Sequence, residues 1–534
     1  MTNGKKTIRS AVATLCAVAV IGTGVASTDV VAMAASAGSP YNVTVGIGSD
    51  ATEIRFTWSS DSDVAGQLQI AKTSDVQNGN FPSNSTKQAA SEKMTATEGV
   101  LDNPQNSDHP ISSFLNESGA ALTDEYSNKV TVNGLSANTS YTYRVGDGTT
   151  WSKNYTFKTD APSKNFSFLA FGDPQLGASG NLDNDKAGWA GTLKKVSAKY
   201  PNNNLMFSLG DQVNDYNHLY TQQKEYNAFF NPSADTDYLQ THLLAAFSGN
   251  HDFQMGKYYS FHYNQPNLST LGQTKTNQVG DNNGDYWFRY GSTLFMMLEG
   301  NNFYDISAHD AFMNQAIFAN KDAKWKVVTF HQAPYSEANH DGATTADDDV
   351  MFMRNNWTKL MDKYDVDLVM NGHDHYYTRS YQMLAGSPVD TVKTHQVTNP
   401  KGTVYFTLDS GSGSKYYKYN TTADHSFSSL GWQNNVPTYT YANVTDDAFT
   451  LTTYAVNSET PIDTYTISKK AASATAGNTS AAAVKGTSSV SQTASNPRTG
   501  DEENGTYLAA GIAIVTFLAA AGCVLVLKKR KVNQ

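Results

Sequence analysis

Residues 243–252 have the sequence Leu-Leu-Ala-Ala-Phe-Ser-Gly-Asn-His-Asp, and this stretch decides how the rest of the chain is interpreted. The first five residues form an apolar run whose length and composition predict a buried β-strand. The chain then turns at Gly249 and presents an amide, an imidazole and a carboxylate in consecutive positions, Asn250, His251 and Asp252. Three polar side chains beside a core all need partners. Such an ending is unusual for a purely structural strand and indicates a functional site.

Four other apolar runs end in the same way. They are residues 166–171, followed by Asp173; residues 205–209, followed by Asp211; residues 325–330, followed by His331; and residues 366–370, followed by His373 and His375. In open α/β sheets, ligands bind beyond the carboxyl ends of the strands. The five endings together therefore predict one site that is assembled from distant segments. Oxygen and imidazole donors without thiolates favour a centre for Mn, Fe, Zn or Mg.

The chain has 534 residues, which is enough for about three domains. Residues 41–161 alternate apolar and polar side chains with period two and predict an all-β sandwich, with a polar insertion at 75–125. Residues 164–380 alternate strands with helices, which predicts a parallel sheet. One of these helices should end before Pro201, and residues 285–298 should form a hairpin in a second sheet. Residues 381–470 return to strand-like alternation.

Both ends of the chain carry patterns of export and anchoring. Residues 1–34 combine a basic start, an apolar stretch and a small-residue cleavage site, which predicts a secretory signal peptide. Residues 471–495 consist largely of Ala, Ser, Thr and Gly, as in a flexible spacer. Residues 507–527 form an uncharged span that is long enough to cross a bilayer, and a basic tail follows it.

Residues 496–500, Asn-Pro-Arg-Thr-Gly, directly precede this span. The arrangement of residues 496–534 resembles the sorting signals of Gram-positive cell-wall proteins, although Asn496 stands where leucine is commoner. The resemblance implies that a sortase cuts between Thr499 and Gly500 and joins Thr499 to peptidoglycan. A plain membrane anchor is the alternative. We therefore expect a secreted protein that is covalently attached to the cell wall of a Gram-positive bacterium.

Charge and cysteine content limit the function further. The only two cysteines, Cys16 and Cys523, lie in the end segments, so the exported part contains no disulfide. The chain has a formal net charge of −10, and both end segments are basic, so the exported part is more acidic still. Binding to nucleic-acid polymers, which needs a basic face, is not expected. A small phosphate ester bound by cations remains compatible with this charge.

The order of the strand endings resembles that of the calcineurin-like metallophosphoesterase superfamily. Across residues 164–380 the order is Gly-Asp, Gly-Asp, Gly-Asn-His-Asp, His and Gly-His-x-His. Residues 135–145 resemble part of the fibronectin type III-like domain that precedes enzymes of the purple-acid-phosphatase type. The resemblance implies an α/β (α+β) fold, a four-layer β-sandwich flanked by helices and preceded by an all-β sandwich.

The resemblance also implies two metal ions at the strand ends, with Fe, Mn or Zn expected. Two ions about 3.5–4 Å apart can clamp the attacking and leaving oxygens of a displacement and lower the pKa of a bridging water. The implied ligands are Asp211 as the bridge, Asp173 and His375 for the first ion, and Asn250, His331 and His373 for the second.

Two further roles and two departures follow from the same resemblance. His251 would contact the phosphate or protonate the leaving group, and Asp252 would orient its ring. Gln175 stands where the superfamily commonly has a histidine ligand, and Asn214 stands where the purple enzymes have a tyrosine. The Gln175 carbonyl is a candidate ligand of the first ion. Alternatively, Gln175 hydrogen-bonds the substrate or a water.

The implied function is hydrolysis of phosphate monoesters outside the cell by attack of a metal-activated water. A phosphodiesterase or 5'-nucleotidase is the enzymatic alternative, because the same type of site serves both reactions. A non-catalytic wall adhesin on a phosphoesterase scaffold is the alternative from another class. The intact set of strand-end residues counts against the adhesin, because decay of an active site usually removes at least one of them.

Overall fold

The computed structural model describes residues 39–94, 124–160, 165–216, 218–252, 258–273, 284–340 and 348–470. The predicted signal peptide, spacer and sorting signal, with Thr499, Gly500 and the apolar span 507–527, lie outside these residues, as does most of the 75–125 insertion. Among the residues described, no helix has both the length and the apolarity that crossing a bilayer requires.

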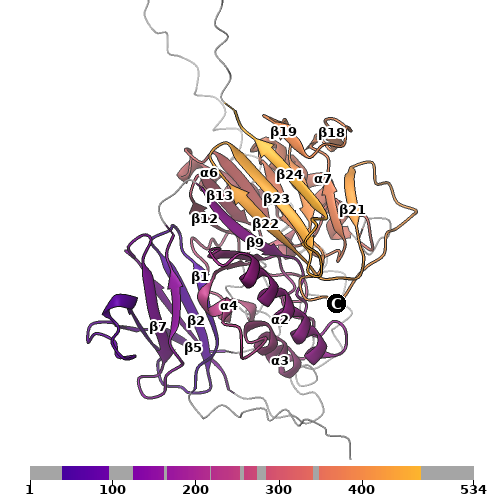
Figure 1. Ribbon diagram of the computed structural model, residues 1–534. Helices are drawn as coiled ribbons and strands as arrows, with labels where there is room; N and C mark the ends of the chain where they lie inside the picture. The colour runs from indigo at the N-terminus through magenta and orange to yellow at the C-terminus, as the bar shows by residue number, and fades with distance from the viewer. Residues whose placement is uncertain are drawn as a thin grey trace, which may run out of the picture. The chain divides into compact units, whose positions relative to one another are not determined.

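Two large sheets carry the strands that lead into the predicted site (Figure 1). In the described part of the chain, one sheet has 11 strands and the other has 7. In spatial order, the first consists of β19 (Gln396–Thr398), β24 (Asp463–Ser468), β23 (Ala448–Ala455), β22 (Thr438–Val444), β9 (Phe166–Phe171), β10 (Leu205–Ser208), β11 (Leu243–Ala246), β1 (Tyr41–Ile47), β2 (Ile54–Ser60), β6 (Tyr126–Val132) and β5 (Ala90–Lys93). The second consists of β12 (Tyr286–Tyr290), β13 (Thr293–Met297), β14 (Trp325–Thr329), β15 (Leu368–Asn371), β20 (Val404–Thr407), β16 (Tyr377–Ser380) and β21 (Ser428–Trp432).

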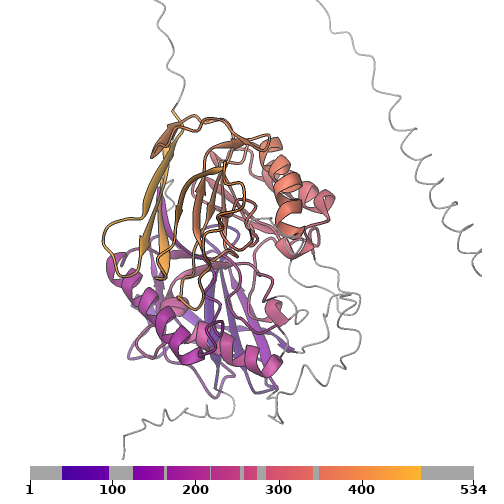
Figure 2. The same ribbon diagram turned by 90° about the vertical axis from the view of Figure 1, so that its right-hand side faces the viewer.

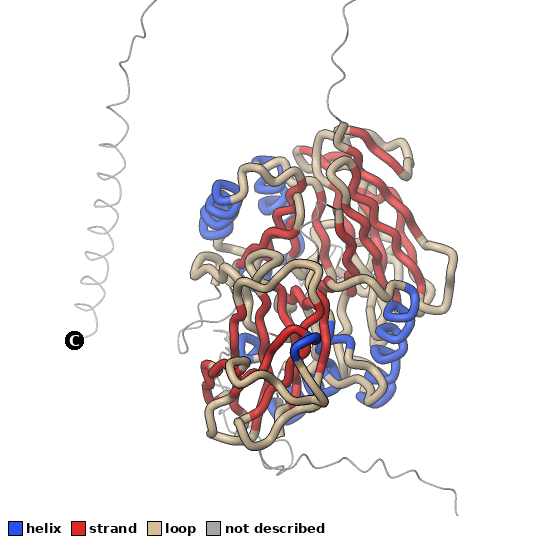
Figure 3. Tube along the Cα trace, turned by 60° about the vertical axis from the view of Figure 1, so that its left-hand side comes forward, coloured by secondary structure: helices blue, strands red, loops and turns tan. Residues whose placement is uncertain are grey.

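Helices cover the outer face of each sheet, which gives the expected four layers (Figures 2 and 3). α2 (Leu182–Lys199) and α3 (Leu219–Phe230) pack on the first sheet, and α2 ends before Pro201 as predicted. α6 (Ile306–Ala319) and α7 (Asp348–Lys363) pack on the second sheet. The smaller elements are α4 (Tyr238–Thr241), α5 (Tyr258–Phe261), the hairpin of β17 (Met383–Leu384) and β18 (Ser387–Pro388), and the short helices η1 (Thr73–Asp75) and η2 (Gly300–Asn302).

The central strands are apolar throughout because both of their faces are buried. In β9, Phe168 and Ala170 face the second sheet, and Leu169 and Phe171 face the helices. The ring of Phe168 lies 5.8 Å from that of Phe295 in β13, edge to face. The predicted hairpin of β12 and β13 is present in the second sheet. The sandwich of two sheets between helices therefore confirms the predicted fold class.

The N-terminal β-strands are joined to the first large sheet, which the sequence did not indicate. β1 pairs in parallel with β11 at Gly46 and Leu244, so β1, β2, β6 and β5 continue that sheet. A four-stranded sheet of β4 (Thr86–Gln88), β3 (Gln67–Lys72), β7 (Ser140–Gly146) and β8 (Tyr155–Lys158) shares a core with them. Tyr143 in β7 also donates a hydrogen bond to the carbonyl of Gln240, at 2.7 Å.

A buried carboxylate, Glu125, ties these N-terminal strands to the helical layer. Glu125 is 5% exposed and accepts hydrogen bonds from Tyr41, at 2.8 Å, from Gln223 in α3, at 2.7 Å, and from Tyr258 in α5. Burial raises the pKa of Glu125 above its ordinary value of 4.5, and the three donors oppose this only in part. The folded protein therefore binds the proton of the Glu125 carboxyl group more tightly than the unfolded chain does.

This raised pKa predicts a pH-dependent contribution to stability. The contribution is fully present below the unfolded pKa of 4.5 and is lost as the pH rises through the folded pKa. In Glu125→Gln, which cannot ionise, this fall in the free energy of unfolding should be absent. Urea denaturation of the metal-free wild type and variant between pH 4 and 8 measures the difference. Identical pH slopes in the two proteins would contradict the prediction.

Candidate metal centre

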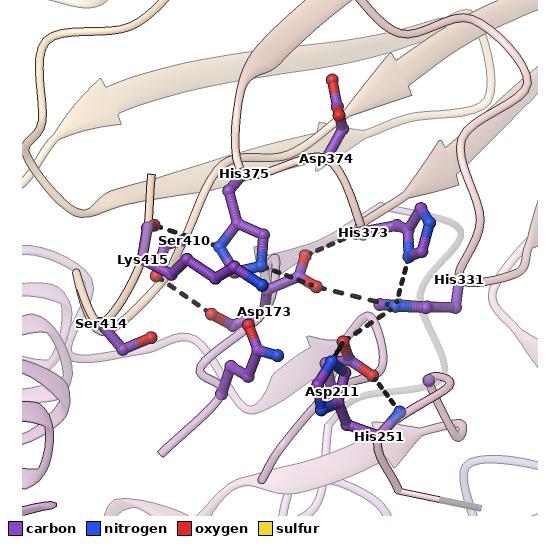
Figure 4. A network of polar contacts seen from close by, with 12 residues as sticks. Asp173, Asp211, His251, His331, His373, Asp374, His375, Ser410, Ser414 and Lys415 are labelled. Carbon is purple, nitrogen blue, oxygen red and sulfur yellow. Dashed lines mark hydrogen bonds and ion pairs between the residues drawn. The ribbon is translucent and has the colours of Figure 1, made fainter. Parts of the chain in front are cut away.

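The five strand ends meet at one place, where the two sheets come together (Figure 4). Strands β9, β10 and β11 are parallel neighbours, as are β14 and β15, so the carboxyl ends of each group share one sheet edge. Direct contacts join the two groups. The Nε2 atom of His331 lies 3.3 Å from Oδ2 of Asp211, and the main-chain N–H of His373 donates to Oδ2 of Asp173 at 2.7 Å.

The side chains expected to hold the second ion converge closely. Nδ1 of His373 lies 3.0 Å from Oδ1 of Asn250 and 3.3 Å from Nε2 of His331. The other ring nitrogen of His331, Nδ1, donates to the carbonyl of Leu209 at 2.9 Å. That hydrogen bond fixes the ring and leaves Nε2 available as a ligand. The donor set of Asp211, Asn250, His331 and His373 therefore fits a cation.

The side chains expected to hold the first ion lie farther apart. Nε2 of His375 is 3.8 Å from Oδ1 of Asp173, which is fully buried and has no hydrogen-bond partner. Nδ1 of His375 donates to the carbonyl of Lys415 at 3.1 Å, so its Nε2 also faces the centre. Single atoms of Asp173, Asp211 and His331 lie within 4.8 Å of one another and could hold one ion between them.

Gln175 lies next to the turn that carries Asp211. Its side chain is fully buried, and its Oε1 atom has no hydrogen-bond partner. Its Nε2 atom contacts Oδ1 of Asn214 at 3.4 Å, and its main-chain N–H donates to the carbonyl of Asp211 at 2.8 Å. A buried acceptor without a donor is costly, so Oε1 fits a cation or a bound donor. Its role as a ligand remains a prediction.

The backbone around the centre is held in a strained conformation. Five candidate ligands adopt the left-handed region that non-glycine residues rarely occupy; they are Asp173 (φ 28°), Gln175 (φ 34°), Asp211 (φ 44°), His373 (φ 75°) and His375 (φ 43°). Gly249 permits one of the close approaches, because a Cβ there would lie 2.0 Å from Oδ1 of Asp211. Strain of this kind clusters at functional sites.

The charges of the buried groups are unbalanced in a way that fits a cation. Burial raises the pKa of Asp173 to about 8. Burial alone would lower the pKa of His331, but the negative charges of Asp211 and Asp173 raise it to about 10. Burial likewise lowers the pKa of His373 and His375 well below the ordinary value. Asp173 and His331 thus both favour their protonated forms, and a metal ion would take the place of these protons.

His251 lies beside the converging ligands. Its main-chain N–H donates to Oδ1 of Asp211 at 2.9 Å, and its Nε2 atom lies 4.0 Å from Oδ2 of the same residue. Its Nδ1 atom donates to the carbonyl of Asn214. Nε2 is therefore the ring nitrogen that faces the site.

The expectation that Asp252 orients the His251 ring is wrong. The Asp252 carboxylate is fully buried and accepts hydrogen bonds from the main-chain N–H groups of Gly249, at 2.8 Å, and Gln212, at 3.1 Å, and from Tyr226, at 3.2 Å. It therefore holds the turns after β10 and β11, and the Asn214 carbonyl orients the ring instead. A side chain adjacent in sequence points away because consecutive residues after a strand need not share a direction.

Several residues near the centre were missed by the sequence analysis. The ring of His340 lies 4.2 Å from that of His373, and the ring of Tyr417 lies 5.2 Å from that of His375. Tyr216 lies 5.1 Å from His251, edge to face. A signal for the 409–417 loop was present, because the apolar run 403–408 leads into Asp409 and β20 pairs in parallel with β15. His340 follows no strand directly and had no such signal.

Comparison with known proteins agrees with this geometry. Residues 40–159 match the N-terminal domain of purple acid phosphatases, and residues 166–377 match the calcineurin-like phosphoesterases. The protein named probable inactive purple acid phosphatase 27 of Arabidopsis thaliana is 24% identical over 304 residues, which are 53% of this chain and 48% of that protein. The chain thus matches only about half the length of this plant relative.

Two other similar proteins carry different names. A protein of Hordeum vulgare named nucleotide pyrophosphatase/phosphodiesterase is 23% identical over 286 residues, which are 51% of this chain and 76% of that protein. The structure of the purple acid phosphatase PPD1 from yellow lupin, Lupinus luteus, matches with a TM-score of 0.61 at 17% identity, covering 81% of this chain and 75% of that one. Residues 40–159 are therefore similar to the N-terminal domain of purple acid phosphatases, and residues 166–377 are similar to the calcineurin-like phosphoesterases.

Proposed function

We propose that this protein hydrolyses phosphate monoesters outside the cell in a metal-dependent reaction. The observation that carries the proposal is the convergence of Asn250, His331 and His373 beside Asp211, with ring and amide atoms 3.0–3.3 Å apart. Metal ions bound by such donors activate water and stabilise negative charge on phosphoryl oxygens. Phosphoesterase chemistry also agrees with the calcineurin-like match over residues 166–377.

The residues around the donors have distinct tasks in this reaction. Nε2 of His251 faces the site and gives a proton to the leaving oxygen or a hydrogen bond to the phosphoryl group. The Asn214 carbonyl accepts the hydrogen of Nδ1 and fixes the ring, so the ring acts as a donor at Nε2 when it carries a second hydrogen there. His340 and Tyr417 form an aromatic rim, with ring centroids 5.4 Å apart, that contacts the organic part of the ester.

A second candidate function is hydrolysis of phosphodiesters or nucleotide pyrophosphates. The observation that favours it is the likeness to the barley protein of that name. Assays of the purified full chain with para-nitrophenyl phosphate, its bis-ester and a dinucleotide separate the candidates, with Mn, Zn or Fe added back after chelation. A larger kcat/KM for the monoester supports our proposal. No hydrolysis of any ester with any metal would overturn both functions and leave a non-catalytic role.

We further propose that the mature protein is secreted and bound covalently to the cell wall. The support is the sorting-signal pattern of residues 496–534 and the export pattern of residues 1–34. Muralidase digestion of cells should release the protein with attached wall fragments. Extraction of the full-length chain by mild detergent alone, with nothing released by muralidase, would contradict sortase anchoring between Thr499 and Gly500.

Gln175 provides a prediction about the metal content. If its unpartnered Oε1 atom is a ligand, the first ion has a neutral and weak donor in place of an imidazole. Gln175→His should then tighten the binding of the first ion, and Gln175→Ala should weaken it. Metal analysis of both variants provides the measurement. Unchanged stoichiometry and affinity in both would remove Gln175 from the ligand set and leave it as a partner of substrate or water.

A further inference from the structure

The loop of residues 409–417, which follows β20, is fastened to the turn that carries Asp173. The hydroxyl of Ser410 donates to the Asp173 carbonyl at 3.1 Å, and that of Ser414 donates to the Pro174 carbonyl at 3.2 Å. The main-chain N–H of Gly411 donates to the Gly172 carbonyl at 2.6 Å. These bonds fix the position of the loop relative to the first-ion side of the centre.

This loop places Lys415 at the centre. The Lys415 carbonyl accepts the hydrogen bond from Nδ1 of His375 at 3.1 Å. Its Nζ atom lies 4.9 Å from the centroid of the Tyr417 ring, which itself lies 5.2 Å from the His375 ring. Figure 4 shows the Lys415 side chain extending past His375 towards Asp173. The ammonium group therefore lies on the same side as the first-ion donors.

The Lys415 side chain lies beside both of these donors, Asp173 and His375 (Figure 4). Within the described part of the chain, no ion pair joins Lys415 to a carboxylate. Its positive charge is thus directed at the centre.

The donors of the first position suit a tightly bound metal ion less well than those of the second. The protein atoms there are one buried carboxylate, Asp173, one imidazole, His375, the shared Asp211 and the neutral amide of Gln175. A fixed ammonium beside them repels a divalent cation, and at low effective dielectric this repulsion is strong. Among the residues that the structure describes, the second position has no lysine of this kind, and it has two imidazoles.

We propose that Lys415 supplies the positive charge on the first side of this centre, so that the protein holds one metal ion tightly and binds a phosphoryl oxygen of the substrate through the Lys415 ammonium. This inference rests on the proposed phosphoesterase function. It concerns the positively charged group that binds the substrate's phosphoryl oxygen. Lysine binds phosphate as a compact point charge with three donors. A phosphoryl oxygen that reaches Nζ would give the ammonium an anionic partner, which no described carboxylate provides as an ion pair.

The test compares Lys415→Met with wild type and with Lys418→Met, an exposed lysine in the following segment. The full chain is stripped with a chelator, reloaded with Mn or Zn, dialysed and analysed for metal. Wild type and Lys418→Met should retain one ion per chain. Lys415→Met should bind the first ion at least about tenfold more tightly, because a like charge is removed. Lys415→Met/Gln175→His should retain two ions.

Calorimetric titration with inorganic phosphate gives a second reading. The Kd of the one-ion protein for phosphate should rise by about tenfold or more in Lys415→Met, and Lys415→Arg should recover most of the affinity because it keeps the charge. Two equally tight ions in wild type, with metal and phosphate affinities unchanged in Lys415→Met, would overturn the inference. Phosphoesterase activity would survive that outcome. Absence of any metal binding or hydrolysis would instead refute the proposed function.

Discussion

Asp211→Asn should abolish tight metal binding and, with it, phosphoesterase activity. Asp211 joins a second-ion ligand to the turn of His251, because its Oδ2 atom lies 3.3 Å from Nε2 of His331 and its Oδ1 atom accepts the main-chain N–H of His251. An amide has nearly the same shape but no charge. Loss of an outer partner of a metal ligand already costs roughly 10–100-fold in affinity or activity, and loss of an anionic ligand should cost more.

The matched control is Asp183→Asn, which removes an exposed carboxylate in α2. This control should keep wild-type metal content and kcat/KM. Metal analysis after dialysis, together with assay of the monoester, measures both variants. A wild-type metal content in Asp211→Asn would show that the centre lies elsewhere. Thermal denaturation of the chelated proteins shows whether the substitution also affects folding.

His251→Ala should lower turnover by about 10²–10⁴-fold and leave the metal content unchanged, as expected for loss of a general acid. The structural reason is that its ring is fixed by the Asn214 carbonyl and its Nε2 atom faces the site without joining the converging donors. The main-chain N–H of this residue, which contacts Asp211, is retained in the variant. The fold of the turn should therefore survive.

Replacement of another histidine provides the control for this prediction. The side chain of His395 is 78% exposed, so His395→Ala should leave kcat and metal content unchanged. A leaving group of low pKa needs little protonation, and a good leaving group should therefore recover part of the lost turnover if His251 is the acid. Loss of metal in His251→Ala would make this residue a ligand. Equal loss for all leaving groups would assign it to binding the phosphoryl group.

The sequence predicts the layers and the site region because the information is local. The apolar runs that lead into Asp173 and Asp211 are buried on both faces, since the strands lie between a second sheet and helices. The helix that ends before Pro201 is predicted by spacing and by the chemistry of proline. Polar side chains that follow such strands need partners, so the sequence predicts that a functional site lies at the strand ends.

Other features depend on which distant segments come together. The main-chain N–H of His373 meets the carboxylate of Asp173 across 200 residues of sequence, and β1 pairs with β11 at Gly46 and Leu244. The main-chain donors and acceptors at the edge of a strand can pair with any other strand. A local sequence pattern therefore does not predict which strand will be the partner. The same holds for the turn after a strand, where backbone direction decided that Asn214, not Asp252, contacts His251.

The sequence by itself determined which residue types stand at the strand ends, because burial of a strand and formation of the following turn depend on residues that are close in sequence. What only the tertiary structure decided is the balance of charge at the centre. The apolar run 403–408 marks the start of the loop, but Lys415 lies beside Asp173 and His375 only because hydrogen bonds fasten that loop to the turn after β9. Electrostatic interactions act through space, so they follow the fold and not the order of the chain.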